Sequence, residues 1–171
     1  MEFGIKDITD GWFNWYLKDN KKGVEIIASR YAEEDFVKQF LINLTEFIRD
    51  KKEKRFSIFA EPGFVTINMS IDQSDNFNLE LAFEHMSDLP DEDMQKAKKY
   101  YKFVTSMYLM RTEFVPTILK AFKRYERSHL MLDCYEENWT VAIGWMNREK
   151  FSFPFHELQE LHLTASDIRI N

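Results

Sequence analysis

The sequence predicts a single α+β domain over residues 1–171, with a mainly antiparallel β-sheet of about five or six strands and helices packed on one face. Two kinds of periodicity support this class. Several segments alternate apolar and polar residues, which is typical of strands with one buried face. Two other segments repeat apolar residues three and four positions apart, which is typical of amphipathic helices. The length suits one sizeable core, and no repeat or linker indicates a domain boundary.

The first predicted hairpin joins residues 11–18, "GWFNWYLK", to residues 23–29, "GVEIIAS". Aromatic and β-branched residues favour strands, and the turn between them supplies Asn20 and Gly23. A further strand is predicted in residues 55–63, "RFSIFAEPG", which ends at a Pro-Gly pair.

A second hairpin is predicted from residues 63–72, "GFVTINMSID", and residues 76–85, "NFNLELAFEH". Apolar residues occupy every second position of both segments, so each strand should bury one face. Glu80 and Glu84 then lie on the polar face, exposed to solvent.

The first predicted helix begins near Glu34, and its apolar stripe continues to Ile48. Acidic residues at its start and lysines after its end match the polarity of the helix dipole. A second helix is predicted to open with Thr112 as its N-cap and to run to Tyr125. Pro116 is tolerable there because it falls near the first turn.

Three further segments complete the prediction. Residues 88–99 should form a short capped helix, and residues 151–163 a short helix led by Pro154. Residues 100–111 fit a strand by composition and a helix by spacing, and we favour the strand. The predicted core consists of Phe36, Phe40, Leu44, Phe47, Val65, Ile67, Leu79, Leu81, Phe114, Ile118 and Phe122.

The composition indicates a folded protein that is expected in the cytoplasm. Hydrophobic residues make up 44% of the chain and aromatic residues 16%, which is too many for a disordered protein. No apolar run approaches the roughly 20 residues of a membrane-spanning helix. Glu2, Asp7 and Asp10 interrupt the N-terminus, which therefore does not read as a signal peptide. The lone Cys134 cannot form an internal disulfide.

The net charge of −6 is unevenly distributed along the chain. Residues 56–95 contain nine acidic residues and no lysine or arginine, whereas residues 96–127 carry nine basic residues against Glu113 and Glu126. The two segments could neutralise each other by packing side by side. Alternatively, an exposed acidic surface could attract a cationic protein.

The candidate catalytic residues form no complete motif. "HELQELH" has Glu160 where the zinc-protease pattern needs its second histidine, and His162 points to a different helical face from His156. His129 and Cys134 could form a thiol nucleophile, but a buried or half-buried structural cysteine is the expected role. We therefore predict no catalytic residues and no metal site.

Nucleotide and nucleic-acid binding are disfavoured as well. The five glycines lie too far apart for a phosphate-binding loop, so we predict no cofactor. A basic cluster near residues 96–102 resembles a nucleic-acid patch, yet the overall negative charge opposes binding to a phosphate backbone. Neither nucleic acid nor a membrane is an expected partner.

The order of elements is similar to that of small bacterial immunity-type proteins, the cognate inhibitors encoded beside polymorphic or contact-dependent toxins. The segments that carry the resemblance are "DITDGWFNWYL", "FVKQFLINLTEFI", "EFVPTILKAFKRY" and "NWTVAIGWMNREKFSFPFHELQEL". The resemblance implies a non-enzymatic protein that blocks a toxin, often a nuclease, by binding it.

We therefore predict a binding protein whose acidic surface contacts a cognate protein toxin. Acidic residues would suit the cationic active site of a nuclease and would give fast association. The predicted partner-binding residues are Glu80, Glu84, Asp88, Asp91, Glu92 and Asp93. The alternatives are a small enzyme with a site near His129, Cys134 or His156, and a structural subunit of a homo-oligomer, of which a homodimer is the simplest form.

Overall fold

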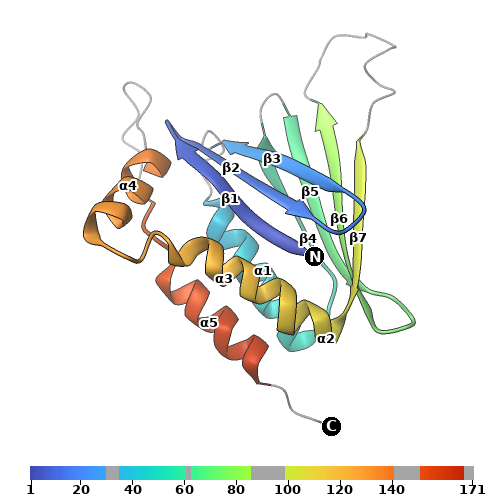
Figure 1. Cartoon of the computed structure of the whole chain (residues 1–171). Helices are drawn as coiled ribbons and strands as arrows, with labels where there is room; N and C mark the ends of the chain where they lie inside the picture. Colours follow the sequence, from blue (N-terminus) through green and yellow to red (C-terminus); the bar gives the residue numbers. More distant parts are fainter. Residues whose placement is uncertain (30–34, 61–62, 86–98, 141–150, 168–171) are drawn as a thin grey trace.

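The computed structural model describes residues 1–29, 35–60, 63–85, 99–140 and 151–167. In these residues, seven strands form two antiparallel sheets, ordered β1-β2-β3 and β4-β5-β6-β7 (Figure 1). The predicted α+β class is therefore confirmed. The strands divide between two sheets where the sequence suggested a single sheet of five or six.

The three-stranded sheet consists of β1 (Glu2–Thr9), β2 (Trp12–Lys18) and β3 (Gly23–Ser29). The β2–β3 hairpin was predicted and is confirmed, with Trp15 opposite Ile26. Strand β1 was not predicted. It pairs with β2 and contains a register shift between Ile5 and Asp7, so its apolar residues do not alternate regularly.

The four-stranded sheet consists of β4 (Lys54–Ala60), β5 (Gly63–Ile71), β6 (Asn76–His85) and β7 (Tyr100–Ser106). The predicted β5–β6 hairpin is confirmed, with Ile67 opposite Leu81. The ambiguous segment 100–111 contains both elements: it is a strand to Ser106 and helical from Met107. The preference for a strand is thus confirmed for its first half alone.

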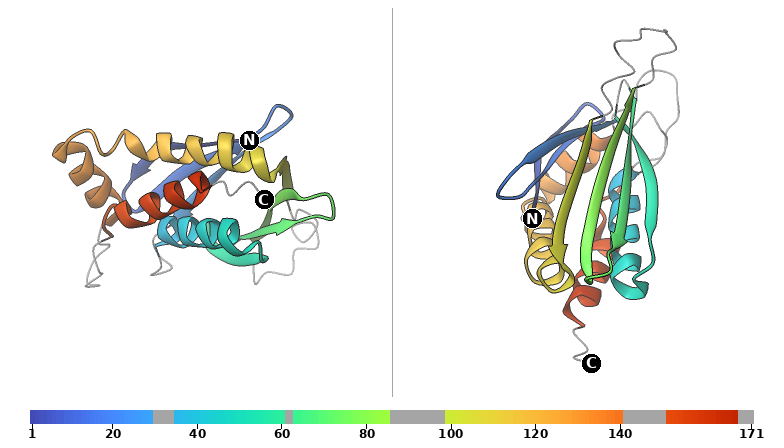
Figure 2. Two further views of the ribbon diagram at one scale, coloured as in Figure 1. Left: turned by 90° about the horizontal axis from the view of Figure 1, so that it is seen from below. Right: turned by 90° about the vertical axis from the view of Figure 1, so that its right-hand side faces the viewer.

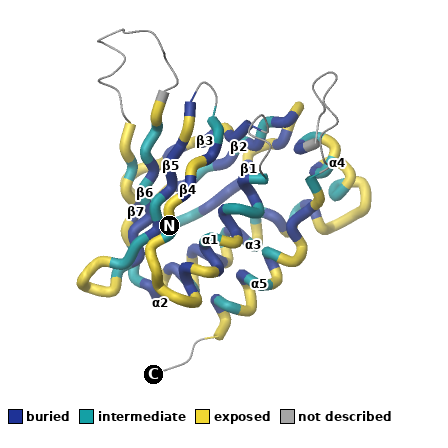
Figure 3. Tube along the Cα trace, turned by 180° about the vertical axis from the view of Figure 1, so that it is seen from behind, coloured by how far each residue is buried: buried dark blue, intermediate teal, exposed yellow. Residues whose placement is uncertain are grey.

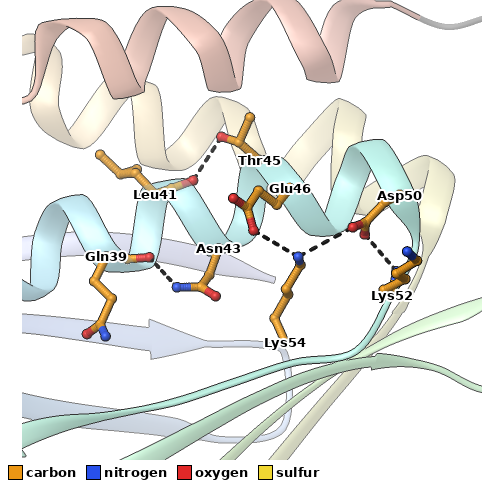
Figure 4. Close-up of polar contacts among 8 residues, drawn as sticks. All are labelled: Gln39, Leu41, Asn43, Thr45, Glu46, Asp50, Lys52 and Lys54. Atoms are coloured by element: carbon orange, nitrogen blue, oxygen red, sulfur yellow. Dashed lines mark hydrogen bonds and ion pairs between the residues drawn. The ribbon is translucent and has the colours of Figure 1, made fainter.

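Helix α1 (Phe36–Asp50) follows the predicted apolar stripe. The Asp35 carboxylate caps it by accepting hydrogen bonds from the amides of Val37 and Lys38. At the other end, Lys54 bridges Glu46 and Asp50 at 2.8 and 3.4 Å (Figure 4). This pair of contacts ties the end of α1 to the first residue of β4.

The second helical segment starts earlier than the sequence suggested. Helix α2 (Met107–Leu109) is capped by Ser106, continues through a π-helical turn (Met110–Phe114) and becomes α3 (Val115–Lys123). The prediction of Thr112 as the N-cap is wrong, because its hydroxyl donates to the Tyr108 carbonyl inside the helix. Pro116 lies in the first turn of α3, and the π-helical turn just before it lets the chain accommodate the missing amide hydrogen.

Two more helices lie near the C-terminus. Helix α5 (Phe155–Ser166) begins after Pro154, as predicted. Helix α4 (His129–Thr140) was not predicted, and its weak segregation of apolar and polar residues explains why. The helix expected in residues 88–99 lies almost entirely outside the described residues.

The helices cover the inner faces of both sheets (Figures 1 and 3). Helix α3 lies along β1, α1 contacts α5 and β4, and β3 lies beside β4. All the predicted core residues are buried, so the predicted core is confirmed. An aromatic cluster that includes Phe13, Trp139 and Phe36 joins α4 to the three-stranded sheet, with ring centroids 5.1 to 5.5 Å apart.

Candidate binding face on the four-stranded sheet

The described helices leave the outward face of the β4–β7 sheet uncovered. The helices lie behind this sheet when its open side faces the viewer (Figure 2, right). Because Val65, Ile67 and Met69 are buried, the intervening residues of β5 point outward. We call this surface the outer sheet face. Its uncharged polar members are Ser57, Thr66, Asn68, Ser70 and Asn78, of which Thr66 and Asn78 are buried between their neighbours.

An ion pair lies in the middle of the outer sheet face. Glu80 Oε1 and Lys102 Nζ are 3.0 Å apart on the paired strands β6 and β7. Partial burial disfavours ionisation of Glu80, but hydrogen bonds from Lys102, Tyr100 and Asn68 outweigh it and lower the pKa of this carboxyl. Glu80 is therefore ionised and locally satisfied.

Three aromatic side chains lie at one end of this face, the half-buried Phe59 and the exposed Phe64 and Tyr100. Phe59 and Phe64 lie opposite each other on β4 and β5 with ring centroids 5.3 Å apart, and Phe64 faces Glu84 on β6. Tyr100 begins β7 at the same end, and 57% of its surface is exposed. We call Phe59, Phe64, Glu84 and Tyr100 the aromatic end. Large apolar groups that remain exposed side by side are typical of interaction surfaces.

The outer face of the three-stranded sheet is less suited to binding. Two of its acidic residues are already paired, since Lys18 contacts Glu2 at 3.1 Å and Lys6 contacts Glu25. Ile27 is the large aliphatic side chain exposed there. No aromatic group comparable to the aromatic end accompanies it among the exposed large hydrophobic residues of the described part of this sheet.

The structure places two of the six predicted partner-binding residues. Glu80 and Glu84 share the outward face of β6, but their environments differ: Glu80 is paired with Lys102, whereas Glu84 is exposed. The pairing of Glu80 corresponds to the local neutralisation considered from the sequence. Asp88, Asp91, Glu92 and Asp93 lie outside the described residues.

Sequence reasoning missed the aromatic members of this surface. Phe64 precedes the buried Val65, and Tyr100 and Val104 lie three residues before and one residue after the buried Phe103, on the opposite face of β7. Their alternation with buried neighbours was the signal that could have identified them. Tyr100 and Val104 were harder to assign, because residues 100–111 fit two secondary structures.

The histidines and the cysteine that could have formed an enzyme site lie at the surface. Cys134 is exposed, which corrects the expectation of a buried or half-buried thiol, and the Asn138 amide lies 3.2 Å from its sulfur. His129 and His156 are exposed on α4 and α5. Glu160 contacts Arg49 at 3.4 Å.

The described residues contain neither a metal-binding cluster nor a helix that could span a membrane. No cluster of three or more histidine, cysteine, aspartate or glutamate side chains is arranged to hold a metal ion within the described part of the chain. None of the described helices combines the length and apolar character needed to cross a membrane.

Comparison with known proteins gives no relative: no family model, no curated protein and no solved structure matches this chain. The similarity in element order to immunity-type proteins therefore stays a prediction. We infer the function from the geometry and chemistry of the outer sheet face.

Proposed function

We propose that this protein is a non-enzymatic cytoplasmic binding protein that neutralises a cognate bacterial toxin by direct contact. The partner binds at the aromatic end of the outer sheet face and at the acidic residues that follow β6 in the sequence. The observation that carries the proposal is the exposure of Phe64, Glu84 and Tyr100 together on a sheet face that no described helix covers.

The aromatic residues supply the binding energy in this proposal. Protein interfaces concentrate their energy in a few aromatic and arginine side chains near the centre, and tyrosine is enriched among them. Tyr100 is 57% exposed and Phe64 is 38% exposed, so both offer apolar surface that a partner can bury. Rigid strands hold both residues, which limits the conformational entropy lost on binding.

Acidic residues supply the attraction at longer range. Glu84 is exposed, and four further acidic residues, Asp88, Asp91, Glu92 and Asp93, follow it within nine positions. A cationic toxin such as a nuclease would be drawn to this end of the sheet, because complementary charge raises the association rate. Glu80 contributes differently, since its pairing with Lys102 fixes the strands beneath the contact.

The test uses the C-terminal domain of the large secreted protein encoded directly upstream, where one exists. This domain should kill bacteria when produced alone, and co-production of the wild-type protein should protect them. The Glu84→Lys/Asp91→Lys variant should associate about tenfold more slowly at low salt, and raising the salt should slow the wild type towards the variant. Tyr100→Ala should weaken binding by at least about 1 kcal/mol.

Two matched controls separate the aromatic end from the rest of the surface. Glu53→Lys changes the charge of an exposed residue outside the outer sheet face, and Leu130→Ala removes an exposed apolar side chain on α4. Neither should alter affinity. Unchanged kinetics in the Glu84 and Tyr100 variants would refute the proposed contact. Light scattering that shows a stable dimer dissociated by Tyr100→Ala would instead assign the face to self-association.

A further inference from the structure

Residues at the C-terminal ends of α1 and α5 and at the start of the α2–α3 segment line a solvent-open pocket of about 760 Å³. This volume falls in the range that small-molecule sites usually occupy. None of its lining residues belongs to the outer sheet face. The pocket is therefore a second surface with its own chemistry.

The charge of the pocket is positive. Arg49, Lys51 and Arg111 line it together with one carboxylate, that of Asp167. Arg49 contacts Glu160 at 3.4 Å and Lys51 contacts Asp75 at 3.5 Å, but all four of these side chains are at least 42% exposed. Exposed pairs of this length contribute little energy, so both cations can turn to a bound anion at small cost.

Arg111 is held in place while part of its guanidinium lacks an acceptor. Its Nη2 donates to the Ile48 carbonyl, 3.2 Å away at the end of α1, which fixes the side chain. Its Nε is buried and has no hydrogen-bond partner among the described residues. Because this Nε has no accessible surface, a ligand in the open pocket would bind the guanidinium through its other nitrogen atoms.

The backbone that carries Arg111 is also unusual. Arg111 and Thr112 belong to the π-helical turn, in which the Val115 amide donates to the Met110 carbonyl five residues back. Single π-helical turns occur frequently at functional sites, although Pro116 gives this one a structural cause as well. The pocket thus combines a fixed guanidinium with a non-standard turn.

The remaining lining consists of Thr112, Thr164 and four largely apolar side chains. Ile48 and Met107 line the pocket beside the charged groups, and Tyr108 and Leu163 contribute surface that is 66% and 54% exposed. A bare inorganic anion would leave these walls in water. A ligand that joins an anionic group to an apolar or aromatic body would contact both kinds of lining.

We propose that this pocket binds a small organic phosphate or carboxylate whose anionic group contacts Arg111, Arg49 and Lys51 and whose apolar part contacts Tyr108 and Leu163. Arg111 directs the anion, because its planar guanidinium matches the geometry of carboxylate and phosphate oxygens. Arg49 and Lys51 add positive charge at the mouth.

The test titrates the full chain with phenyl phosphate, with inorganic phosphate and with phenol, and follows amide chemical shifts by NMR. Phenyl phosphate should give saturable shifts at Arg111, Tyr108 and Leu163, and it should bind about tenfold more tightly than either inorganic phosphate or phenol. Saturable binding that leaves the amides of these three residues unmoved would refute the site.

Variants distinguish a specific site from general attraction to positive charge. Arg111→Gln should weaken phenyl phosphate binding about tenfold, because it removes the positive charge. Glutamine is shorter than arginine, so the contact with the Ile48 carbonyl is lost as well. Arg49→Gln/Lys51→Gln should weaken binding by a similar factor and leaves the Arg111–Ile48 contact unchanged. This double variant therefore tests the site even if Arg111→Gln fails to fold.

The matched control is Lys21→Gln/Lys123→Gln, which removes two exposed cations outside the pocket and should leave the affinity within about twofold. Equal weakening in the control and pocket variants would overturn the proposal, as would equal affinity for inorganic phosphate and phenyl phosphate. The outcome is independent of toxin binding, which the phenyl phosphate titration does not involve.

Discussion

Replacing Gly4 by alanine tests how the unpredicted strand β1 packs on β2. Gly4 lies opposite Tyr16, and a Cβ atom built on Gly4 would come within 2.3 Å of the Tyr16 ring and its hydroxyl oxygen. The Tyr16 hydroxyl donates to Glu2 Oε1 at 3.0 Å, which holds the ring in this position. The alanine side chain and the ring therefore cannot occupy their places together.

The change in the free energy of unfolding caused by Gly4→Ala is the sum of three contributions. Moving the ring away costs about 0.5–1.5 kcal/mol in rotamer strain, and losing the Glu2 contact costs about 0.5–1.5 kcal/mol. Alanine recovers about 0.5–1 kcal/mol, because glycine loses more backbone entropy in a strand. Gly4→Ala should thus lower the free energy of unfolding by about 1 kcal/mol. In a Tyr16→Ala background it should raise that free energy by about 0.5–1 kcal/mol.

Urea titrations of the wild type, both single variants and the double variant provide the measurement. The double-mutant cycle should give a coupling energy of about 2 kcal/mol between positions 4 and 16. Additive effects, with Gly4→Ala equally costly in both backgrounds, would show that the ring does not cover Gly4 and would refute this account of β1.

Two further predictions concern the core and the start of α1. Leu44→Ala and Ile118→Ala should each lower the free energy of unfolding by about 2–5 kcal/mol, measured by urea titration, because both side chains are fully buried. Burial raises the pKa of the Asp35 carboxyl despite the hydrogen bond from Trp139, so the folded state binds its proton more tightly than the unfolded state. The stability contributed by Asp35 is then present below the unfolded-state pKa and lost as pH rises through the folded-state pKa. Asp35→Asn, which keeps the cap, should gain stability relative to the wild type over that rise. Asp35→Ala should be about 1 kcal/mol less stable than Asp35→Asn at every pH, because it loses the cap and neither variant titrates. Parallel wild-type and Asp35→Asn stability curves against pH would contradict this.

The parts of the fold that the sequence predicted are those with a regular period. Val65 to Met69 alternate and Phe36 to Ile48 recur at helical spacing, so both elements could be identified from one stretch of chain. Strand β1 was not predicted, because its register shift breaks the alternation of apolar and polar residues near Ile5. The division into two sheets depends on which strands pair across long separations, and local patterns carry little information about that.

The candidate site was predictable in its charge but not in its shape. Glu80 and Glu84 were correctly assigned to a polar strand face, yet the pairing of Glu80 depends on Lys102 in a segment whose secondary structure was ambiguous. The pocket could not be predicted from the sequence either. Arg49 and Arg111 are far apart in sequence, and a π-helical turn that no propensity predicts sets the position of Arg111.

Strand β7 separates the two proposed surfaces. It begins with Tyr100 at the aromatic end and finishes at Ser106, the cap of the helical segment that carries Arg111. Seven residues of extended chain span about 20 Å, well beyond the Debye length of about 8 Å at physiological salt. Charge changes in the pocket should therefore be screened from the aromatic end. A loss of partner binding in an Arg49 or Lys51 variant would thus indicate a contact at the pocket itself, not an electrostatic effect transmitted along the strand.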